Sequence, residues 1–444
     1  MKLSGLKYKV KGLLNNAAVK NMAIVAIISL GIRAIGFYKD ILIVDRHGLS
    51  EFLDTFYIAI LIPGFISGVF LGSFQSVFIP NYVSELKTGK NVGSFQTTSV
   101  LITLIVALLF LIISTLFTDI YLDTFFPGHT ESYYNLVKAQ FYFLAPCILF
   151  WGHSSLLSGL LTIDGEFTYS TINSLLSPIT IIICLIFFSK QLDIYVLAIG
   201  TLIGSILSFL FLLLQVLKRK LLALKKPDFK SQNIITLFKQ LPAKLASSLL
   251  SGVNPLIDQY FSAQLVVGSI SALTYGAKIP MFSIGLVGTA LGKVLLPYFS
   301  KNAIDDPKKT YEKLHKILGL IIVSTAIIMI ALIICSQPII SLLFERNTFT
   351  SEDTLTVSKI MQMYLLQIPS YVSGLIMVKY LAAINKNNFM VLTSVLSLTL
   401  NVVLNVILIE KIGVYGLALA TSLVSMVNSV VLYTYIRYIN RINV

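Results

Sequence analysis

The chain has 444 residues, of which 56% are hydrophobic and 12% are charged, and its formal net charge is +14. Soluble domains have about 45–50% apolar and about 25% charged residues, so this composition excludes a soluble globular protein and indicates a polytopic membrane protein. The basic residues lie in short loops between apolar runs, which argues against a nucleic-acid-binding domain and is typical of membrane topology.

The apolar runs predict an all-α fold of about twelve transmembrane helices, because a helix needs about 20 apolar residues to cross the hydrocarbon core of a bilayer. Cys147, Cys184 and Cys335 lie inside these runs without metal or disulfide spacing, so we interpret them as packing residues and expect no metal site. The predicted spans are residues 22–44, 54–84, 95–118, 134–160, 168–188, 192–217, 234–263, 270–298, 314–337, 356–384, 388–409 and 413–436.

The loops between these spans alternate in charge. One set is rich in lysine and arginine, and the other has few basic residues and carries acids such as Asp119, Glu131 and Asp353. Because cytoplasmic loops carry the excess of basic residues, this pattern predicts a multi-pass membrane protein with both termini in the cytoplasm. The even number of spans agrees with this orientation.

The sequence also predicts two halves. The richest basic loop, Lys218–Lys230, lies at the middle of the chain and contains Pro227. We therefore expect an N-terminal lobe at 1–217, a basic cytoplasmic linker at 218–233 and a C-terminal lobe at 234–444. Each lobe has six spans, so the two halves insert with the same orientation.

A short internal repeat supports this division. The stretch "PGFISGVFLGSFQSVFIP" at 63–80 aligns without a gap with "PMFSIGLVGTALGKVLLP" at 280–297. Each stretch lies in the second predicted span of its half. Transporters are often built from repeated halves with the substrate site between them, so we expect a central cavity.

Several charges lie inside the predicted spans. An arginine or lysine at the bilayer centre costs about 2.5–3.5 kcal/mol on insertion scales, so it usually faces a cavity or a partner. Some of these side chains can instead reach the interface from a helix end, and Lys39 and Asp40 can neutralise one another. The candidates are Arg33, Lys39 and Asp40 in the first span, Lys239, Lys244 and Asp258 in the seventh, Lys278 and Lys293 in the eighth, and Lys379 in the tenth.

Arg33 and Lys278 are the strongest of these candidates, because each lies well inside an otherwise apolar run. Cations outnumber acids in the spans, which indicates a cavity for an anion. Arginine suits phosphate because its planar fork donates two parallel hydrogen bonds.

Glycines and prolines interrupt the second and eighth spans in particular. They serve either close helix packing or the bending of helices in a protein that opens alternately to each side of the membrane. The positions that we single out as hinge or packing residues are Gly36, Pro63, Gly68, Pro80, Pro280, Gly285 and Pro297.

Four stretches resemble the MurJ/MviN lipid II flippases, in a superfamily that also contains MATE exporters and Wzx-type O-antigen flippases. The segments at 31–44 and 53–82 ("GIRAIGFYKDILIV", "LDTFYIAILIPGFISGVFLGSFQSVFIPNY") resemble the first two helices of that family. The segment at 271–301 ("SALTYGAKIPMFSIGLVGTALGKVLLPYFSK") resembles its eighth helix, and "FERNTFTSED" at 344–353 resembles the loop after the ninth.

This resemblance implies two six-helix lobes around a cationic cavity. The implied activity is to move an undecaprenyl-pyrophosphate-linked saccharide from the inner to the outer leaflet of the bacterial cytoplasmic membrane by alternating access, without enzymatic catalysis. It implies that Arg33, Lys39 and Lys278 bind the pyrophosphate, with Asp40 beside Lys39. Asp54 matches a family aspartate. We expect no cofactor, although a coupling ion is possible, with Asp40, Asp54 and Asp258 as candidates.

The sequence departs from the family pattern at several positions. A family arginine pair falls on Ser67 and Gly68, Ala277 replaces an aspartate, and lysine stands for arginine at positions 39 and 278. The stretch 63–80 is one residue short, and the family type has two further spans. These departures leave open whether the saccharide is lipid II or an O-antigen, capsule or exopolysaccharide unit.

Other functions are also considered. A MATE-type cation exporter should have an acidic cavity, whereas the excess here is basic. A membrane enzyme would need a carboxylate pair or a metal site, and the spans contain few acids and no D-x-D motif. A scaffold for other cell-envelope biosynthesis proteins is the remaining alternative, and such proteins are also possible partners of a flippase.

Overall fold

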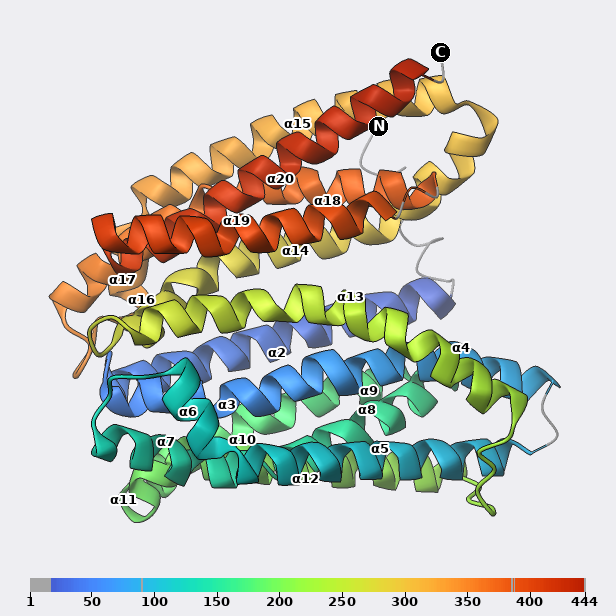
Figure 1. The fold of residues 1–444 in the computed structure, drawn as a ribbon, viewed down its shortest axis with the longest axis horizontal. Helices are drawn as coiled ribbons and strands as arrows, with labels where there is room; N and C mark the ends of the chain where they lie inside the picture. Colours follow the sequence, from blue (N-terminus) through green and yellow to red (C-terminus); the bar gives the residue numbers. More distant parts are fainter. Residues whose placement is uncertain (1–16, 89–90, 385, 387, 443–444) are drawn as a thin grey trace, which may run out of the picture. The chain divides into compact units, whose positions relative to one another are not determined.

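The computed structural model describes residues 17–88, 91–384, 386 and 388–442, and within these ranges the chain is helical with no β-strand (Figure 1). An isolated bridge between Arg346 and Phe349 is the one β-type pairing of the described residues. The predicted all-α fold class is therefore confirmed.

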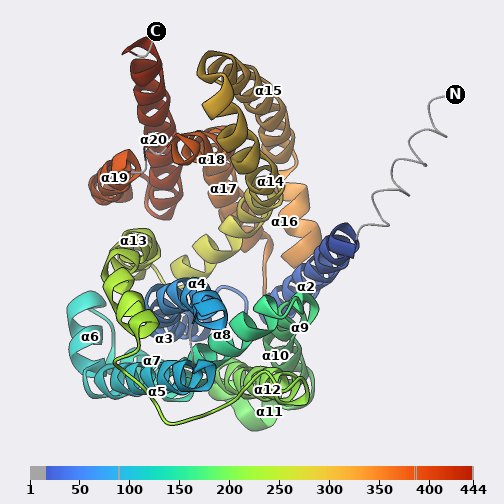
Figure 2. The same cartoon turned by 90° about the vertical axis from the view of Figure 1, so that its right-hand side faces the viewer.

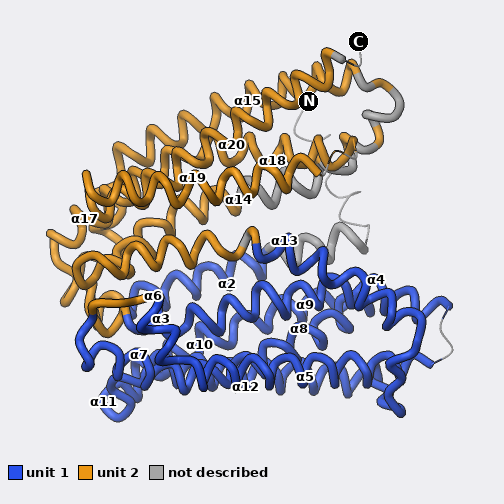
Figure 3. Tube along the Cα trace, viewed as in Figure 1, with its two compact units in different colours: residues 1–43, 55–124, 129–249 blue, residues 44–54, 125–128, 250–444 orange. Residues whose placement is uncertain are grey.

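The chain forms two compact units (Figure 3). Unit 1 comprises residues 1–43, 55–124 and 129–249, and unit 2 comprises residues 44–54, 125–128 and 250–444. The main boundary lies inside one long helix, α13, between Leu249 and Leu250. The predicted lobes 1–217 and 234–444 stay a prediction about functional organisation.

The first half of α13 belongs to unit 1 through polar contacts with α4. The Asn81 amide donates to Gln240 (2.9 Å), the Ser73 hydroxyl donates to Ser248 (2.8 Å), and Asn233 donates to Glu85 (2.6 Å). Between membrane helices, hydrogen bonds of this kind take the place of the hydrophobic driving force that water supplies. They join the segment after the basic loop to the N-terminal helices.

Unit 1 contains most of α2 and the helices that follow it up to the first half of α13. In chain order these are α2 (Ala17–His47), α3 (Glu51–Phe65), η1 (Ile66–Leu71), α4 (Gly72–Thr88), α5 (Val92–Leu116), α6 (Thr118–Phe125), α7 (Glu131–Leu144), α8 (Cys147–Ile163), α9 (Phe167–Ile172), α10 (Leu176–Phe187), α11 (Ser189–Leu192), α12 (Val196–Lys218) and α13 (Gln232–Ala263). Short 3₁₀ turns, η2 (Asn173–Leu175) and η3 (Asp193–Tyr195), precede α10 and α12.

Unit 2 contains the second half of α13 and the seven helices that follow. These are α14 (Ser269–Asp305), α15 (Pro307–Ile334), α16 (Ser336–Phe344), α17 (Ser351–Leu365), α18 (Ile368–Ala383), α19 (Asn388–Ile412) and α20 (Val414–Ile442). Figure 2 shows α18 between α15 and α20, and α18 packs against both of them.

Local sequence signals set the helix starts. The Thr350 hydroxyl accepts from the backbone N–H of Asp353, and the Asp353 carboxylate accepts from the backbone of Thr350, which forms a capping box at α17. Asp306 caps α15 through the N–H of Lys309, and Pro307 occupies the first helical position.

Nine helical stretches in the described residues are long and apolar enough to cross a membrane, and they coincide with nine of the twelve predicted spans. The other three predicted ranges fall on α2, α13 and α14, which are also helical. These three helices contain most of the charges that the sequence places inside the membrane. The total of about twelve spans stays a prediction.

Small residues allow close helix contacts in unit 1. A Cβ added at Gly204 of α12 would lie 2.5 Å from the Cα of Ser177, and the Thr180 hydroxyl of α10 donates to the carbonyl of Gly200 (2.7 Å). Packing of this kind is typical of membrane helices, whose apolar side chains gain little by leaving lipid. Aromatic side chains fill the space between α4 and α5, where Phe78 stacks on Phe95 with ring centroids 5.9 Å apart.

Candidate functional site

Arg33, Gly36 and Asp40 share one face of α2, because positions i, i+3 and i+7 of a helix lie on the same side. Arg33 is exposed, whereas Asp40 is 5% exposed. A Cβ added at Gly36 would meet no atom within 4 Å. The middle of this face is therefore open, and the arginine lies one turn from a glycine that leaves room for a ligand.

Lys39 forms an ion pair with its neighbour Asp40, with the ammonium 3.0 Å from a carboxylate oxygen. The lysine side chain is 22% exposed, and the carboxylate side chain is 8% exposed. The neutralisation of Lys39 by Asp40, considered as an alternative from the sequence, is present in the structure. This pair lowers the net charge that Lys39 offers to an anion.

The positions at which the family arginine pair falls lie in a π-helix. η1 covers Ile66–Leu71, and the backbone N–H of Gly72 donates to the carbonyl of Ser67, which is five residues earlier. Single π-helical turns inside α-helices are rare and are frequent at functional sites. Gly68 is exposed, and a Cβ there would meet no atom within 4 Å. No pattern in the sequence indicates this π-helix.

Asp54 is a helix-capping residue in unit 2. Its carboxylate accepts from the backbone N–H groups of Gly268 (2.7 Å) and Ser271 (2.8 Å) and from the Ser271 hydroxyl. These donors lie at the start of α14, whose positive dipole end favours a carboxylate. The residue is 3% exposed, and its contacts indicate that it positions α14. A role for Asp54 in ion coupling stays a prediction.

Lys278 lies on α14, two turns after this cap. Its side chain is half-buried, with the ammonium 5.9 Å from the centroid of the Tyr275 ring. Tyr275 is fully buried and contacts Phe344 edge to face, with ring centroids 5.4 Å apart. Gly276, which lies between Tyr275 and Lys278 in the sequence, allows α14 to approach α17, because a Cβ there would lie 2.4 Å from Ile360. Lys278 is thus carried by a tightly packed helix segment.

Asp258 has a polar environment that the sequence analysis missed. Its carboxylate accepts from the side-chain amides of Asn405 (3.1 Å) and Asn401 (3.4 Å) of α19, and the Thr421 side chain lies nearby. Asn405 is fully buried, and its Oδ1 has no hydrogen-bond partner among the described residues. The signal that would have found this cluster is the pair of asparagines at i and i+4 inside an apolar run.

This cluster offers oxygen ligands to a small cation. One carboxylate, two carboxamides and one hydroxyl are the donor types that hard cations prefer. In the part of the chain that the structure describes, no group of three or more His, Cys, Asp or Glu side chains could hold a metal ion. In the structure both asparagine amides present their N–H groups to the Asp258 carboxylate, so they would have to rotate to offer their oxygens to a cation.

The remaining hinge candidates lie within helices. Pro63 is buried in α3 three residues before the π-helix, Pro80 is exposed in α4, and Pro280 is buried in α14. Gly285 is half-buried in α14; Pro297 is on the same helix, and its side-chain surroundings lie outside the described residues. Their roles in bending stay a prediction.

The predicted site residues divide between the units. Arg33, Gly36, Lys39 and Asp40 belong to unit 1, whereas Asp54, Asp258 and Lys278 belong to unit 2. The structure brings Lys39 and Asp40 together. A shared cavity lined by cations from both units stays a prediction.

The chain forms two helical units with charged side chains on several apolar helices, and charges of this kind are typical of membrane transporters. An inward-facing MATE family transporter of the MOP superfamily shares the fold, with a TM-score of 0.73, 14% identity and coverage of 93% of this chain and 97% of that chain. The structure titled "Lipid II flippase MurJ, inward closed conformation" matches with a TM-score of 0.82 and 28% identity, and covers 94% of this chain and 87% of that chain.

The family model described as "Lipid II flippase MurJ" matches residues 46–441. A probable lipid II flippase MurJ from Buchnera aphidicola subsp. Schizaphis graminum is 30% identical over 430 residues, which are 94% of this chain and 82% of that protein. The lipid II flippase MurJ from Thermosipho africanus is 29% identical over 397 residues, which are 89% and 81% of the two chains. The chain belongs to the MurJ lipid II flippase family, and it is a multi-pass membrane transporter rather than an enzyme.

Proposed function

We propose that this protein moves an undecaprenyl-pyrophosphate-linked saccharide, with lipid II as the first candidate, from the inner to the outer leaflet of the cytoplasmic membrane. The observation that carries the proposal is the family match over residues 46–441, together with the solved flippase that shares the fold. The intramembrane cations give the proposal its chemistry. The protein would work by alternating access of one binding site to the two sides of the membrane.

The pyrophosphate of such a lipid must leave the headgroup region and cross the low-dielectric interior. Arg33 is exposed on α2 and offers a planar fork that matches phosphate oxygens, and Lys278 offers a point charge from unit 2. Lys39 is held by Asp40 and contributes less net charge. Transport follows if the cations of both units bind one pyrophosphate and the helices that carry them then tilt.

A flippase for an O-antigen, capsule or exopolysaccharide unit is the alternative cargo assignment, and the relatives reported above do not favour it. The reason to test this alternative is a departure from the family pattern in the second span. Ser67 and Gly68 replace the cations that the family resemblance places in the second span, and here they lie in a π-helix. The saccharide is therefore best identified by experiment.

Complementation tests the cargo directly. The chain is expressed in a bacterial strain depleted of its lipid II flippase and in a second strain that lacks its O-antigen flippase. We expect growth to be restored in the first strain. Restoration of O-antigen alone, with equal amounts of protein in the membranes, would contradict lipid II as the cargo and would assign the change to the second span.

We also infer from the loop charges that both termini lie in the cytoplasm. Cysteine-substituted variants at Lys225 in the basic loop and at Glu131 on the acidic side test this orientation with a membrane-impermeant thiol reagent. Both are made in a Cys335→Ser background, because Cys335 is exposed. Labelling of the residue 131 variant alone in intact cells is the expected result. Partner proteins of cell-envelope biosynthesis are expected to act next to the flippase, and cross-linking in these cells identifies them.

Coupling to a cation is proposed to occur at Asp258. This choice among the three acidic candidates rests on surroundings, because Asp40 is paired with Lys39 and Asp54 caps α14. Asp258 has two asparagines and a threonine around it, and one buried carboxamide oxygen there has no hydrogen-bond partner among the described residues. A monovalent cation at this position would link helices α13 and α19, which a transport cycle can use.

A further inference from the structure

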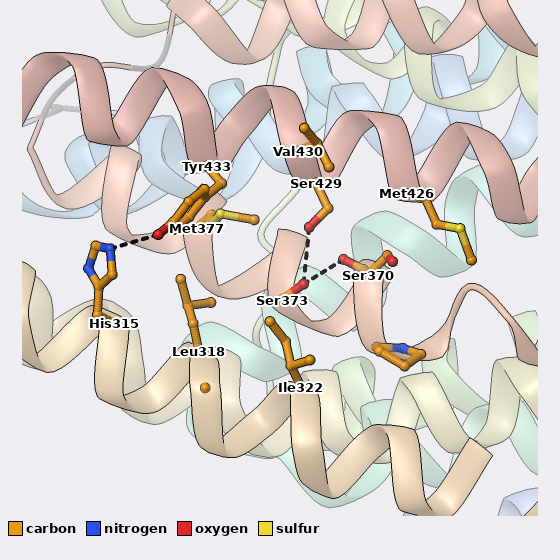
Figure 4. Close-up of a pocket in the computed structure, with 12 residues that line it drawn as sticks. His315, Leu318, Ile322, Ser370, Ser373, Met377, Met426, Ser429, Val430 and Tyr433 are labelled. Carbon is orange, nitrogen blue, oxygen red and sulfur yellow. Dashed lines mark hydrogen bonds between the residues drawn. The ribbon is translucent and has the colours of Figure 1, made fainter. Parts of the chain in front are cut away.

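Unit 2 contains a groove between α15 and α20, with α18 as its floor (Figure 4). Its volume is about 560 Å³, within the range of roughly 300–1,000 Å³ that is typical of small-molecule sites. Leucine, isoleucine, valine and methionine side chains line most of its length, among them Leu318, Ile322, Met377, Met426 and Val430. An apolar groove between membrane-spanning helices suits a hydrocarbon chain.

The polar groups of the groove are ordered along its length. In its middle the hydroxyls of Ser373 and Ser429 are 3.0 Å apart and join α18 to α20. At one end His315 of α15 forms a hydrogen bond with the Tyr433 hydroxyl of α20 (3.0 Å), as Figure 4 shows. The groove therefore has an apolar end and an end closed by a histidine and a tyrosine.

Cations continue the groove beyond this polar end. Tyr433, Arg437 and Arg441 recur every four residues and so lie on one face of α20. All three lie close enough to the Tyr311 hydroxyl, one turn before His315, to interact with it electrostatically. Both arginines are exposed, and the sequence from Val431 to Val444 contains no acidic residue. We call Tyr311, His315, Tyr433, Arg437 and Arg441 the cationic collar.

Unit 1 has a pocket at the corresponding place, and the segment that follows α12 covers it. The pocket of about 200 Å³ lies against α5, α8 and α12, the third, fourth and sixth spans of the first half, and it is also lined by Leu222 and Leu224. That covering segment is fixed to α5, because the Gln96 side chain bonds the backbone of Leu221 (2.7 Å) and Ala223 (2.8 Å). The groove in unit 2 lies on the corresponding helices, and its lining residues in the described part of the chain belong to α15, α18 and α20.

We propose that this groove binds one anionic glycerophospholipid of the membrane, with an acyl chain between α15 and α20 and the phosphate on the cationic collar. Charge complementarity selects this occupant. An apolar groove that ends in two arginines, a histidine and two tyrosines matches an anionic lipid, and basic pockets between membrane helices are known to bind lipid headgroups. The bound lipid would stabilise unit 2 by bridging α15 and α20.

Native mass spectrometry of the full-length protein in detergent tests this site. The probes are phosphatidylglycerol and phosphatidylcholine with the same acyl chains, undecaprenyl phosphate, and inorganic phosphate. We expect one phosphatidylglycerol to bind at least tenfold more tightly than phosphatidylcholine, and inorganic phosphate not to displace it. The Arg437→Gln/Arg441→Gln double variant should lose that preference. The Lys309→Gln/Lys313→Gln variant removes the same charge from α15 away from the groove and should keep it.

A second variant tests the apolar part of the groove. Gly319 lines the groove, and a Cβ there would meet no atom within 4 Å, so Gly319→Leu fills the space without a clash at the backbone. We expect it to abolish retention of the lipid while the protein stays folded. Equal binding of the two phospholipids, unchanged retention in both variants, or displacement by an equal concentration of undecaprenyl phosphate would overturn the proposal.

Discussion

The carboxylate of Asp54 accepts a hydrogen bond from the backbone N–H of Ser271, 217 residues further along the chain, at 2.8 Å. A second bond from the N–H of Gly268 (2.7 Å) completes the contact. The N–H of Ser271 belongs to the first turn of α14, and the N–H of Gly268 directly precedes the helix. N–H groups at this end of a helix lack internal acceptors. This contact holds the start of the helix that carries Lys278.

Loss of this cap should destabilise the protein. Asp54→Ala leaves two buried N–H groups without an acceptor, which costs about 1–3 kcal/mol for each group. We expect a lower midpoint of thermal unfolding in detergent, and size-exclusion chromatography of heated samples measures this midpoint. Glu131→Ala is the matched control, because it removes an exposed acid from the first turn of α7 and should cost only about 0.3–1 kcal/mol. Equal midpoints for the two variants would contradict the capping role.

The close contact between α14 and α17 gives a second prediction. Gly276→Ala would place a methyl group 2.4 Å from Ile360, so the helices must separate, and overpacking of this kind costs about 1–3 kcal/mol. We expect reduced thermal stability and reduced transport, since Lys278 moves with its helix. The measurement is the unfolding midpoint together with the initial rate of lipid flipping in proteoliposomes. A stable, fully active variant would show that α14 tolerates displacement.

Gly36→Ala separates helix bending from packing. The added methyl group meets nothing within 4 Å, and alanine favours a helix over glycine by about 1 kcal/mol. The variant should therefore be as stable as the natural protein or more stable. If α2 bends at Gly36 during transport, the flipping rate falls while stability rises. Rates equal to those of the natural protein would remove Gly36 from the hinge residues.

Asp258→Asn should abolish the response of transport to a coupling cation. The substitution keeps the size of the side chain and removes its charge, so the site loses most of its attraction for a cation. Asn405→Ala should impair the response more than Asn401→Ala, because its amide lies closer to the carboxylate, at 3.1 Å against 3.4 Å. Flipping rates are measured in proteoliposomes over a range of sodium concentration and of pH, with the membrane potential held constant. An unchanged cation response in Asp258→Asn would assign coupling elsewhere.

The fold was largely predictable from the sequence because long apolar runs admit few structures other than helices. Nine predicted spans coincide with apolar helices of the described residues. The remaining three, α2, α13 and α14, are helical and contain Arg33, Asp258 and Lys278. These three helices therefore carry candidate site residues that the sequence singles out.

Several features of the site were not predictable from one-dimensional patterns. The π-helix at Ile66–Leu71 depends on a backbone hydrogen bond between Gly72 and Ser67, and no residue type specifies such a bond. The partners of Asp54 and Asp258 lie far away in the sequence, and only folding brings them together. The pairing of Lys39 with Asp40 was foreseen, because the two residues are neighbours.

We propose that the intramembrane cations Arg33 and Lys278 bind the pyrophosphate of the transported lipid. The most direct test measures lipid II flipping in proteoliposomes by Arg33→Ala, Lys278→Ala and the control Lys226→Ala, which removes an exposed lysine from the basic loop outside the predicted spans. The account predicts that the first two variants insert and fold normally but flip at least a hundredfold more slowly, and that the control is active. Full flipping by the Arg33→Ala/Lys278→Ala double variant would contradict it.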